Sequence, residues 1–265
     1  TGRYVEIKML PFSFREFVEV YNTKNIDEAF DAYLKFGGMP FLAHLNYQDV
    51  PSRDYLVDLY SSILLKDIVQ RHKVRDAELL SRIIGYAVSE SGHIISAASI
   101  QRYLKSEKRS VAFDTVMNYL QFGKESFLFD LVKREDLMGK HILSVDEKVY
   151  AIDHGMRHAI VGGSASRDIE RTLEIIVFHE LVRRGYEVRI GRVKEKEVDF
   201  VCQRGDERKY FQVCYMMDSE ETREREFSAL FGINDQYPKV ILSLDRINFS
   251  SGGIIHKKIP EFLLQ

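Results

Sequence analysis

The sequence predicts an α/β protein with three parts: an N-terminal helical segment, a winged helix and a mixed-sheet domain. A length of 265 residues is enough for about two domains, and 45% hydrophobic with 29% charged residues is typical of a globular chain rather than a disordered one. The predicted elements also change along the chain, from helices alone, to three short helices and a hairpin, to helices mixed with strands. These changes place the parts at residues 1–75, 76–165 and 166–265.

The N-terminal part is the helical segment. Residues 4–9 alternate in polarity, which predicts a strand running into a helix, and a strand without an earlier partner suggests that the chain begins within a domain. Residues 26–36 have the spacing of an amphipathic helix that ends at Gly37-Gly38. A longer helix is expected over residues 52–71, and its polar end is either a contact between domains or a set of charges facing water.

The middle part has the element order of a winged helix, which is helix, short helix, helix and hairpin. Ser96 is a good N-cap for the second helix. The expected elements are helices at residues 79–89, 97–104 and 111–122 and strands at residues 127–132 and 148–152.

Polar and basic residues of this middle part predict a DNA-binding surface. The third helix would act as the recognition helix, since lysine, asparagine and glutamine can contact phosphates and base edges. The expected DNA-contacting residues are Arg102, Lys105, Lys108, Arg109, Thr115 and Asn118. The alternative is a winged helix that contacts another protein, with these polar side chains solvated. A net charge of −2 argues against a generic polyanion-binding protein but leaves local basic patches open.

Several enzyme classes are excluded by their missing motifs. The sequence contains no Gly-x-x-x-x-Gly-Lys-Ser/Thr loop, so the chain should not hydrolyse ATP by itself. It also lacks a Gly-x-Ser-x-Gly elbow, a His-Glu-x-x-His helix and the paired cysteines of a zinc site.

Composition also bears on the compartment. No apolar run approaches the ~20 residues that span a bilayer, and no signal-peptide pattern is present, so we expect a cytoplasmic protein with no membrane contact. Cys202 and Cys214 are too few for a secreted disulfide framework. Both lie in strand-like stretches, where we expect buried free thiols, with a bond across the sheet as the alternative.

The last part carries one constellation suited to chemistry. Glu174 lies on a predicted helix, Asp199 on a strand, and Gln212 on the next strand, so a hairpin would set Asp199 and Gln212 side by side. Phosphodiester hydrolysis needs a hard cation such as Mg²⁺ or Mn²⁺ held by oxygen ligands, for which Asp199 is the candidate ligand, together with a lysine. Alternatively, Asp199 pairs with an arginine and Gln212 closes a buried hydrogen bond.

These positions resemble the PD-(D/E)xK restriction-endonuclease-like superfamily, in which a helix glutamate, a strand aspartate and a third strand form the active site. Nearly the whole chain is also similar to the C-terminal region of bacterial and archaeal AAA-type ATP-binding proteins. The matching stretches are Thr1-Gly2-Arg3-Tyr4, Leu10-Pro11-Phe12-Ser13-Phe14-Arg15-Glu16, Gly37-Gly38-Met39-Pro40, Lys66-Asp67-Ile68-Val69, Thr115-Val116-Met117-Asn118-Tyr119-Leu120, Asp153-His154-Gly155-Met156-Arg157, Leu173-Glu174, Glu180-Leu181, Arg183-Arg184-Gly185-Tyr186, Val198-Asp199-Phe200-Val201, Gln212-Val213 and Arg225-Glu226-Phe227.

This resemblance implies that residues 1–75 correspond to the end or lid of an ATPase domain. The nucleotide-binding part would lie upstream, so ATP would act only through that domain as a partner. It also implies that residues 166–265 form the nuclease-like domain, with Glu174, Asp199 and Gln212 at the catalytic positions.

The chain departs from the nuclease pattern at two positions. Gln212 and Cys214 stand where the motif has a carboxylate and a lysine. Losing a stabilising donor of this kind typically costs ~10²–10³ in rate. Lys196, Lys209 and Arg223 are the cations considered as replacements.

We therefore expect a DNA-binding part of an AAA-type protein whose nuclease-like domain is inactive. The alternatives are an active metal-dependent endonuclease that uses Glu174 and Asp199, and a protein-interaction adaptor with no nucleic-acid role. A basic cleft between the winged helix and the last domain would favour the first two over the adaptor.

Overall fold

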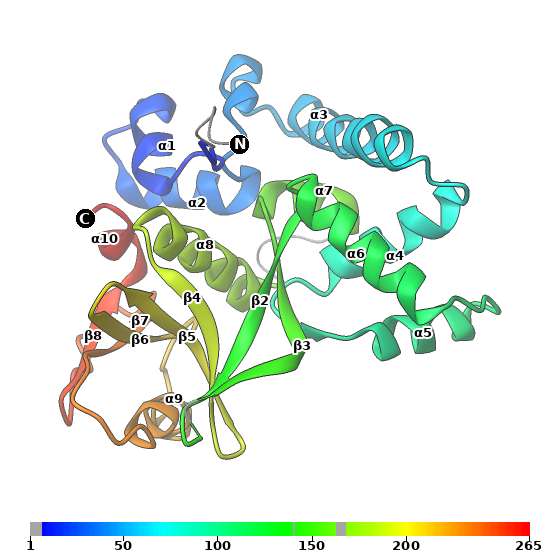
Figure 1. Cartoon of the computed structure of the whole chain (residues 1–265). Helices are drawn as coiled ribbons and strands as arrows, with labels where there is room; N and C mark the ends of the chain where they lie inside the picture. Colours follow the sequence, from blue (N-terminus) through cyan, green and yellow to red (C-terminus); the bar gives the residue numbers. More distant parts are fainter. Residues whose placement is uncertain (1–6, 140, 163–167) are drawn as a thin grey trace.

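The strands of the computed structural model form one mixed sheet in the order β1-β3-β2-β4-β5-β6-β7-β8, with helices around it (Figure 1). The structure describes residues 7–139, 141–162 and 168–265. This architecture confirms the predicted α/β class. No helix in these described ranges is long and apolar enough to cross a membrane.

The N-terminal helices are fixed by local capping. Ser13 and Glu16 form a capping box at the start of the first helix, and the Asn25 side chain caps the second. The elements are α1 (Phe14–Tyr21), α2 (Ile26–Phe36), η1 (Pro40–Leu45), α3 (Asp49–Ser62) and η2 (Ile63–Gln70).

Two expectations for this segment differ from the structure. The strand predicted at residues 4–9 falls partly outside the described residues, and its described part, residues 7–9, has no regular structure. Ile7 and Met9 are more than four-fifths exposed, so no neighbour buries the alternating apolar positions. The single helix predicted over residues 52–71 is an α-helix followed by a π-helical turn.

The middle part has the predicted element order. Ser96 caps its second helix and accepts a hydrogen bond from the Ser99 amide, as expected. A short strand before that helix pairs antiparallel with the second strand of the hairpin. The elements are α4 (Ala77–Ser89), β1 (Ile94–Ile95), α5 (Ala97–Ser106), α6 (Phe113–Glu125), β2 (Phe129–Asp136) and β3 (His141–Ala151).

A helix that sequence reasoning missed, α7 (His154–Val161), joins the N-terminal segment to the rest. The Asp153 carboxylate is buried and accepts hydrogen bonds from the Met156 and Gly38 amides, both at 2.7 Å. Gly155 lies so close to α2 that a Cβ there would be 1.9 Å from the Phe36 carbonyl oxygen. The Gly37-Gly38 and Asp153-His154-Gly155 stretches therefore form one packing contact.

The last part places helices on both faces of the sheet. Phe200 and Phe211 belong to the core under the long helix α8, whereas their neighbours Val201 and Tyr210 belong to the core under α9. The elements are α8 (Ile169–Arg183), β4 (Glu187–Val193), β5 (Lys196–Arg204), β6 (Glu207–Val213), α9 (Glu220–Phe231), β7 (Lys239–Ser243), β8 (Ile254–Lys258) and α10 (Ile259–Leu263).

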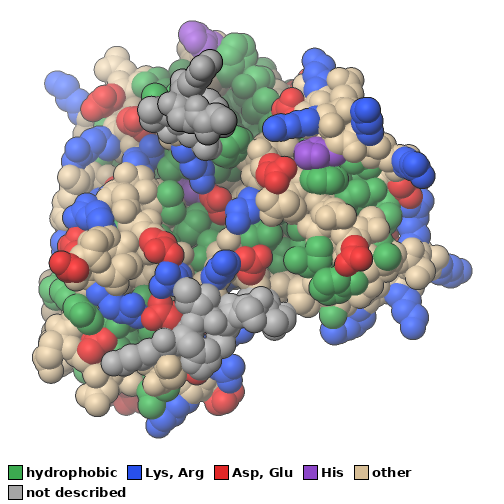
Figure 2. Space-filling model, viewed as in Figure 1, with side chains coloured by type: hydrophobic (Ala, Val, Ile, Leu, Met, Phe, Trp, Pro, Cys, Tyr) green, Lys and Arg blue, Asp and Glu red, His purple; other side chains and the backbone are tan. Residues whose placement is uncertain are grey.

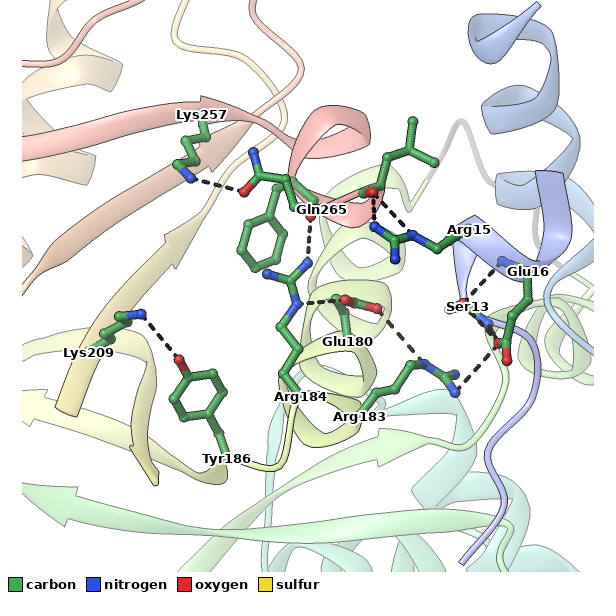
Figure 3. Close-up of polar contacts among 12 residues, drawn as sticks. Ser13, Arg15, Glu16, Glu180, Arg183, Arg184, Tyr186, Lys209, Lys257 and Gln265 are labelled. Atoms are coloured by element: carbon green, nitrogen blue, oxygen red, sulfur yellow. Dashed lines mark hydrogen bonds and ion pairs between the residues drawn. The ribbon is translucent and has the colours of Figure 1, made fainter. Parts of the chain in front are cut away.

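Polar contacts tie the N-terminal segment to the end of α8 and to α10 (Figure 3). Arg183 donates to the Pro11 carbonyl at 2.6 Å and pairs with Glu16 at 3.7 Å. Arg15 donates to the Leu264 carbonyl, and Arg184 donates to the Phe262 carbonyl at 2.6 Å. The segment around Pro11 and helix α10 thus both contact the C-terminal end of α8.

The sheet is continuous between the middle and last parts. Strand β2 pairs in parallel with β4 through residues 134–136 and 190–192. Glu135 is buried there and accepts hydrogen bonds from Arg189 at 3.3 Å and Arg208 at 2.6 Å. Its charge is therefore compensated across three strands.

Candidate functional site

The structure brings the predicted residues Glu174 and Asp199 near each other, whereas Gln212, beside Asp199, faces the other side of the sheet, where its side chain donates to Glu226 of α9. Glu174 projects from the first half of α8, and Asp199 and Gln212 lie on the paired strands β5 and β6. The Asp199 amide donates to the Gln212 side-chain oxygen at 3.3 Å. The hairpin thus places these two residues side by side, as predicted.

A lysine that the sequence analysis did not consider supplies the positive charge of this site. Lys148, on β3, has its ammonium 2.5 Å from one carboxylate oxygen of Glu174 and 2.8 Å from one of Glu197. Its side chain is 5% exposed. Tyr150, two residues along the same strand, donates its hydroxyl to the same Glu174 oxygen. A cation and a hydroxyl from β3 therefore hold Glu174.

The other polar groups are also satisfied by the protein. Asp199 accepts a hydrogen bond from the Val213 amide at 2.7 Å, and Gln212 donates to Glu226 at 3.1 Å. Arg225 in turn pairs with Glu226 at 2.8 Å. Each of these buried carboxylates has a donor, as buried charge requires.

Burial and mutual repulsion disturb the ionisation of this cluster. Burial first, and the charge of Glu174 second, raise the pKa of Asp199 well above its usual range, while Lys148 acts in the opposite direction. Burial would lower the pKa of Lys148, but the carboxylates of Glu174, Asp199 and Glu197 outweigh it and raise that pKa. Lys148 therefore remains charged at neutral pH.

The donor set around Asp199 does not form a ready metal site. No group of three or more histidine, cysteine, aspartate or glutamate side chains within the described residues is placed to hold a metal ion. The Lys148 ammonium lies between Glu174 and Glu197, so a divalent cation shared by these carboxylates would have to displace it. Asp199 stays a predicted ligand of Mg²⁺ or Mn²⁺.

The cations considered as replacements for the motif lysine point elsewhere. Lys196 donates to Ser228, Lys209 pairs with Glu207, and the Arg223 guanidinium stacks over the Phe249 ring. Cys214 is a buried free thiol, as is Cys202, and burial raises the pKa of both. The expectation of unpaired buried thiols is confirmed.

Sequence reasoning missed Lys148, Tyr150, Glu197 and Glu226. One signal was available on the strands, because Lys148 and Tyr150, and likewise Glu197 and Asp199, are two residues apart and share a face. The pairing of β3 with the last part depends on the β2–β4 contact. That contact has no local sequence signature.

The six predicted DNA-binding residues lie on α5, α6 and the turn between them, on the other side of the β2–β3 hairpin from α8 (Figure 1). Arg102, Lys105, Lys108 and Asn118 are exposed, and Thr115 is half-buried. Arg109 differs, because Glu78 holds its guanidinium at 2.7 Å. Lysine and arginine side chains line the outer rim of the lobe formed by α3 to α6 (Figure 2).

Comparisons with known proteins identify relatives over almost the whole chain. A family model described as "Domain of unknown function (DUF8612)" matches residues 27–167. An uncharacterized protein of Haemophilus influenzae is 34% identical over 248 residues, which cover 92% of this chain and 60% of the relative. The uncharacterized protein MJ1544 of Methanocaldococcus jannaschii is 28% identical over 264 residues, which cover 93% of this chain and 56% of the relative. The chain thus spans less than two thirds of either relative, and no solved structure matches it.

Proposed function

The chain belongs to the DUF8612 family, and we propose that it is the DNA-binding part of an ATPase-coupled protein whose nuclease-like site no longer cleaves. Residues 76–165 act as a winged helix that contacts DNA. Residues 166–265 form a PD-(D/E)xK-like domain kept for binding. The nucleotide-binding domain is the upstream partner through which ATP acts.

The observation that carries DNA binding is a face of unpaired cations on and after α5. Arg102, Lys105 and Lys108 follow one another at intervals of three residues, which places the first two on one helix face. All three are exposed and form no ion pair within the described parts of the chain. Unpaired surface cations in such a row suit a phosphate backbone.

The arrangement around Lys148 supports the loss of cleavage. Its ammonium bridges Glu174 and Glu197, and the Tyr150 hydroxyl also occupies Glu174. Carboxylates that are already neutralised by a buried lysine have little gain from binding a metal ion. The cluster then contributes to holding α8 on β3 rather than to catalysis.

The contacts at the far end of α8 support coupling to an upstream domain. Arg183 and Arg184 connect α8 to the segment around Pro11 and to α10 (Figure 3). The segment that resembles the end of an ATPase domain therefore contacts the helix that carries Glu174. A movement imposed on that segment would reach the nuclease-like site through one rigid helix.

Duplex DNA binding tests the proposal. Fluorescence anisotropy with a labelled duplex should show the logarithm of the association constant falling linearly with the logarithm of the salt concentration. Lys105→Ala should weaken binding and reduce the slope by about one, because one phosphate contact is lost. The exposed Lys24, in the turn just before α2, gives the matched control Lys24→Ala, which should leave the slope unchanged. Absence of binding, or equal effects of both variants, would reject the proposal in favour of the adaptor.

A second candidate is an active metal-dependent endonuclease, and Lys148 is also the observation that favours it. This lysine brings to Glu174 and Asp199 the cation that Cys214 cannot provide. In that case binding of a metal ion and DNA would draw Lys148 away from Glu174 towards the attacked phosphate. Metal-dependent cleavage distinguishes the two candidates.

A further inference from the structure

The sheet contains a wedge-shaped opening between β2 and β4. The two strands run in parallel and pair only through residues 134–136 and 190–192 among the described residues, so they diverge towards their N-terminal ends (Figure 1). A cavity of about 290 Å³ lies in this opening, bounded by both strands and by α8. We use "wedge" for this cavity.

Both sides of the wedge present strand edges. The Ile152 amide donates to the Leu128 carbonyl at 3.0 Å, so this pair, at the end of the β2–β3 ladder, is hydrogen-bonded. Hydrogen-bonded and non-hydrogen-bonded pairs alternate along antiparallel strands. The backbone groups of Phe129 and Leu131 therefore point away from β3 and towards the wedge. On the other side, residues 187–189 of β4 pair with β5 and leave their second edge facing the opening. Unpaired strand edges are templates for an additional strand.

The floor and rim of the wedge define what could enter. The floor is aliphatic, with Val132, Val182 and Val188, and Phe178 is its one aromatic residue among those that line it. Figure 2 shows hydrophobic side chains at the bottom of a central hollow with charged side chains around it. Phe178 is 3% exposed, so its ring offers no platform for stacking a base.

The rim carries more positive than negative charge. Its cations are Lys8, Lys124, Lys133 and Arg189, against Asp130 and Glu187. Lys8 pairs with Asp130 at 3.3 Å, and Arg189 pairs with Glu187 at 2.6 Å. Lys124 and Lys133 form no ion pair within the described ranges. An occupant with negative side chains would complement these two lysines.

We propose that the wedge binds an extended acidic segment of a partner protein, which adds a strand between β2 and β4. Backbone hydrogen bonds to Phe129 and Leu131 would fix its direction, and alternate side chains would face the aliphatic floor and the lysines. This interaction is separate from DNA binding on α5. It would let a partner attach at the joint between the middle and last parts of the chain.

The test is binding of a labelled heptapeptide of alternating glutamate and valine, measured by fluorescence anisotropy. We expect binding that weakens about tenfold in Lys124→Glu/Lys133→Glu, because both reversals place like charges beside the peptide. The control Lys24→Glu should bind as the unaltered protein does. A heptapeptide of alternating lysine and valine should not bind.

Hydrogen exchange separates strand addition from simple charge attraction. The acidic peptide should slow exchange at the amides of Phe129 and Leu131. Absence of binding, binding unaffected by the double reversal, or binding without this protection would overturn the proposal. Protection of the same amides by oligothymidylate, and not by the peptide, would overturn it in favour of a nucleic-acid groove. DNA binding through Lys105 would stand in each case.

Discussion

Replacing Lys148 by methionine removes the cation from the buried carboxylate cluster while keeping a side chain of similar length. Lys148 is 4% exposed and lies 2.5 Å from Glu174 and 2.8 Å from Glu197. Removing one partner of a buried ion pair typically lowers the free energy of unfolding by about 3–5 kcal/mol, because the remaining charge stays buried without compensation. We expect Lys148→Met to lose about that much free energy of unfolding at pH 7.

The assay is thermal and chemical denaturation of the variant beside the unaltered protein. For a chain of this size a loss of about 1 kcal/mol lowers Tm by roughly 2–4 °C, so Tm should fall by roughly 6–20 °C. Lys196→Met is the matched control, because Lys196 is an exposed lysine one residue before Glu197 and should change stability by less than about 0.5 kcal/mol.

A second substitution decides whether charge compensation is the cause. Adding Glu174→Gln to Lys148→Met should restore part of the stability, since it removes an uncompensated charge. A loss below about 1 kcal/mol, or a deficit that the second substitution does not reduce, would show that charge compensation by Lys148 is not the cause.

The remaining predictions concern the joint made by α7. Gly155→Ala would bring a Cβ within 1.9 Å of the Phe36 carbonyl oxygen, so overpacking should cost about 3 kcal/mol in denaturant titration. The control is Gly85→Ala within α4, where a Cβ would meet only the Tyr60 hydroxyl at 3.8 Å, and this variant should gain about 0.5–1 kcal/mol of unfolding free energy. Equal effects of the two substitutions would contradict the packing explanation. Burial lowers the pKa of His154 and of His158 from 6.5 to about 4. Between pH 4 and pH 6.5 the unfolded chain therefore binds more protons than the folded chain. The free energy of unfolding should accordingly fall as the pH drops from 6.5 towards 4. His158→Gln should flatten this slope in a pH series of Tm measurements, and an unchanged slope would show that other groups dominate.

Local signals in the sequence were enough to place most elements. Residues 26–36 and the Ser96 cap were predicted because amphipathic spacing and capping residues act within a few residues of each other. The hairpin geometry likewise predicted that Asp199 and Gln212 would be neighbours. These parts of the fold depend on interactions that are close in sequence.

The missed features depend on contacts between distant segments. α7 contains Gly155, which weakens any helix prediction, and its start depends on Asp153 bonding to Gly38 more than a hundred residues away. Lys148 reaches Glu174 only because the β2–β4 pairing joins the two halves of the single sheet. Neither pairing leaves a periodic pattern in the sequence, so the cation of the site could not be assigned from it.

DNA binding without cleavage is tested by incubating plasmid and branched DNA with the protein and either Mg²⁺ or Mn²⁺, and by measuring both retardation and cutting. An Asp199→Ala variant is run in parallel. We expect both proteins to retard the DNA and neither protein to cut it. Metal-dependent cutting by the unaltered protein that disappears in Asp199→Ala would instead establish an active nuclease.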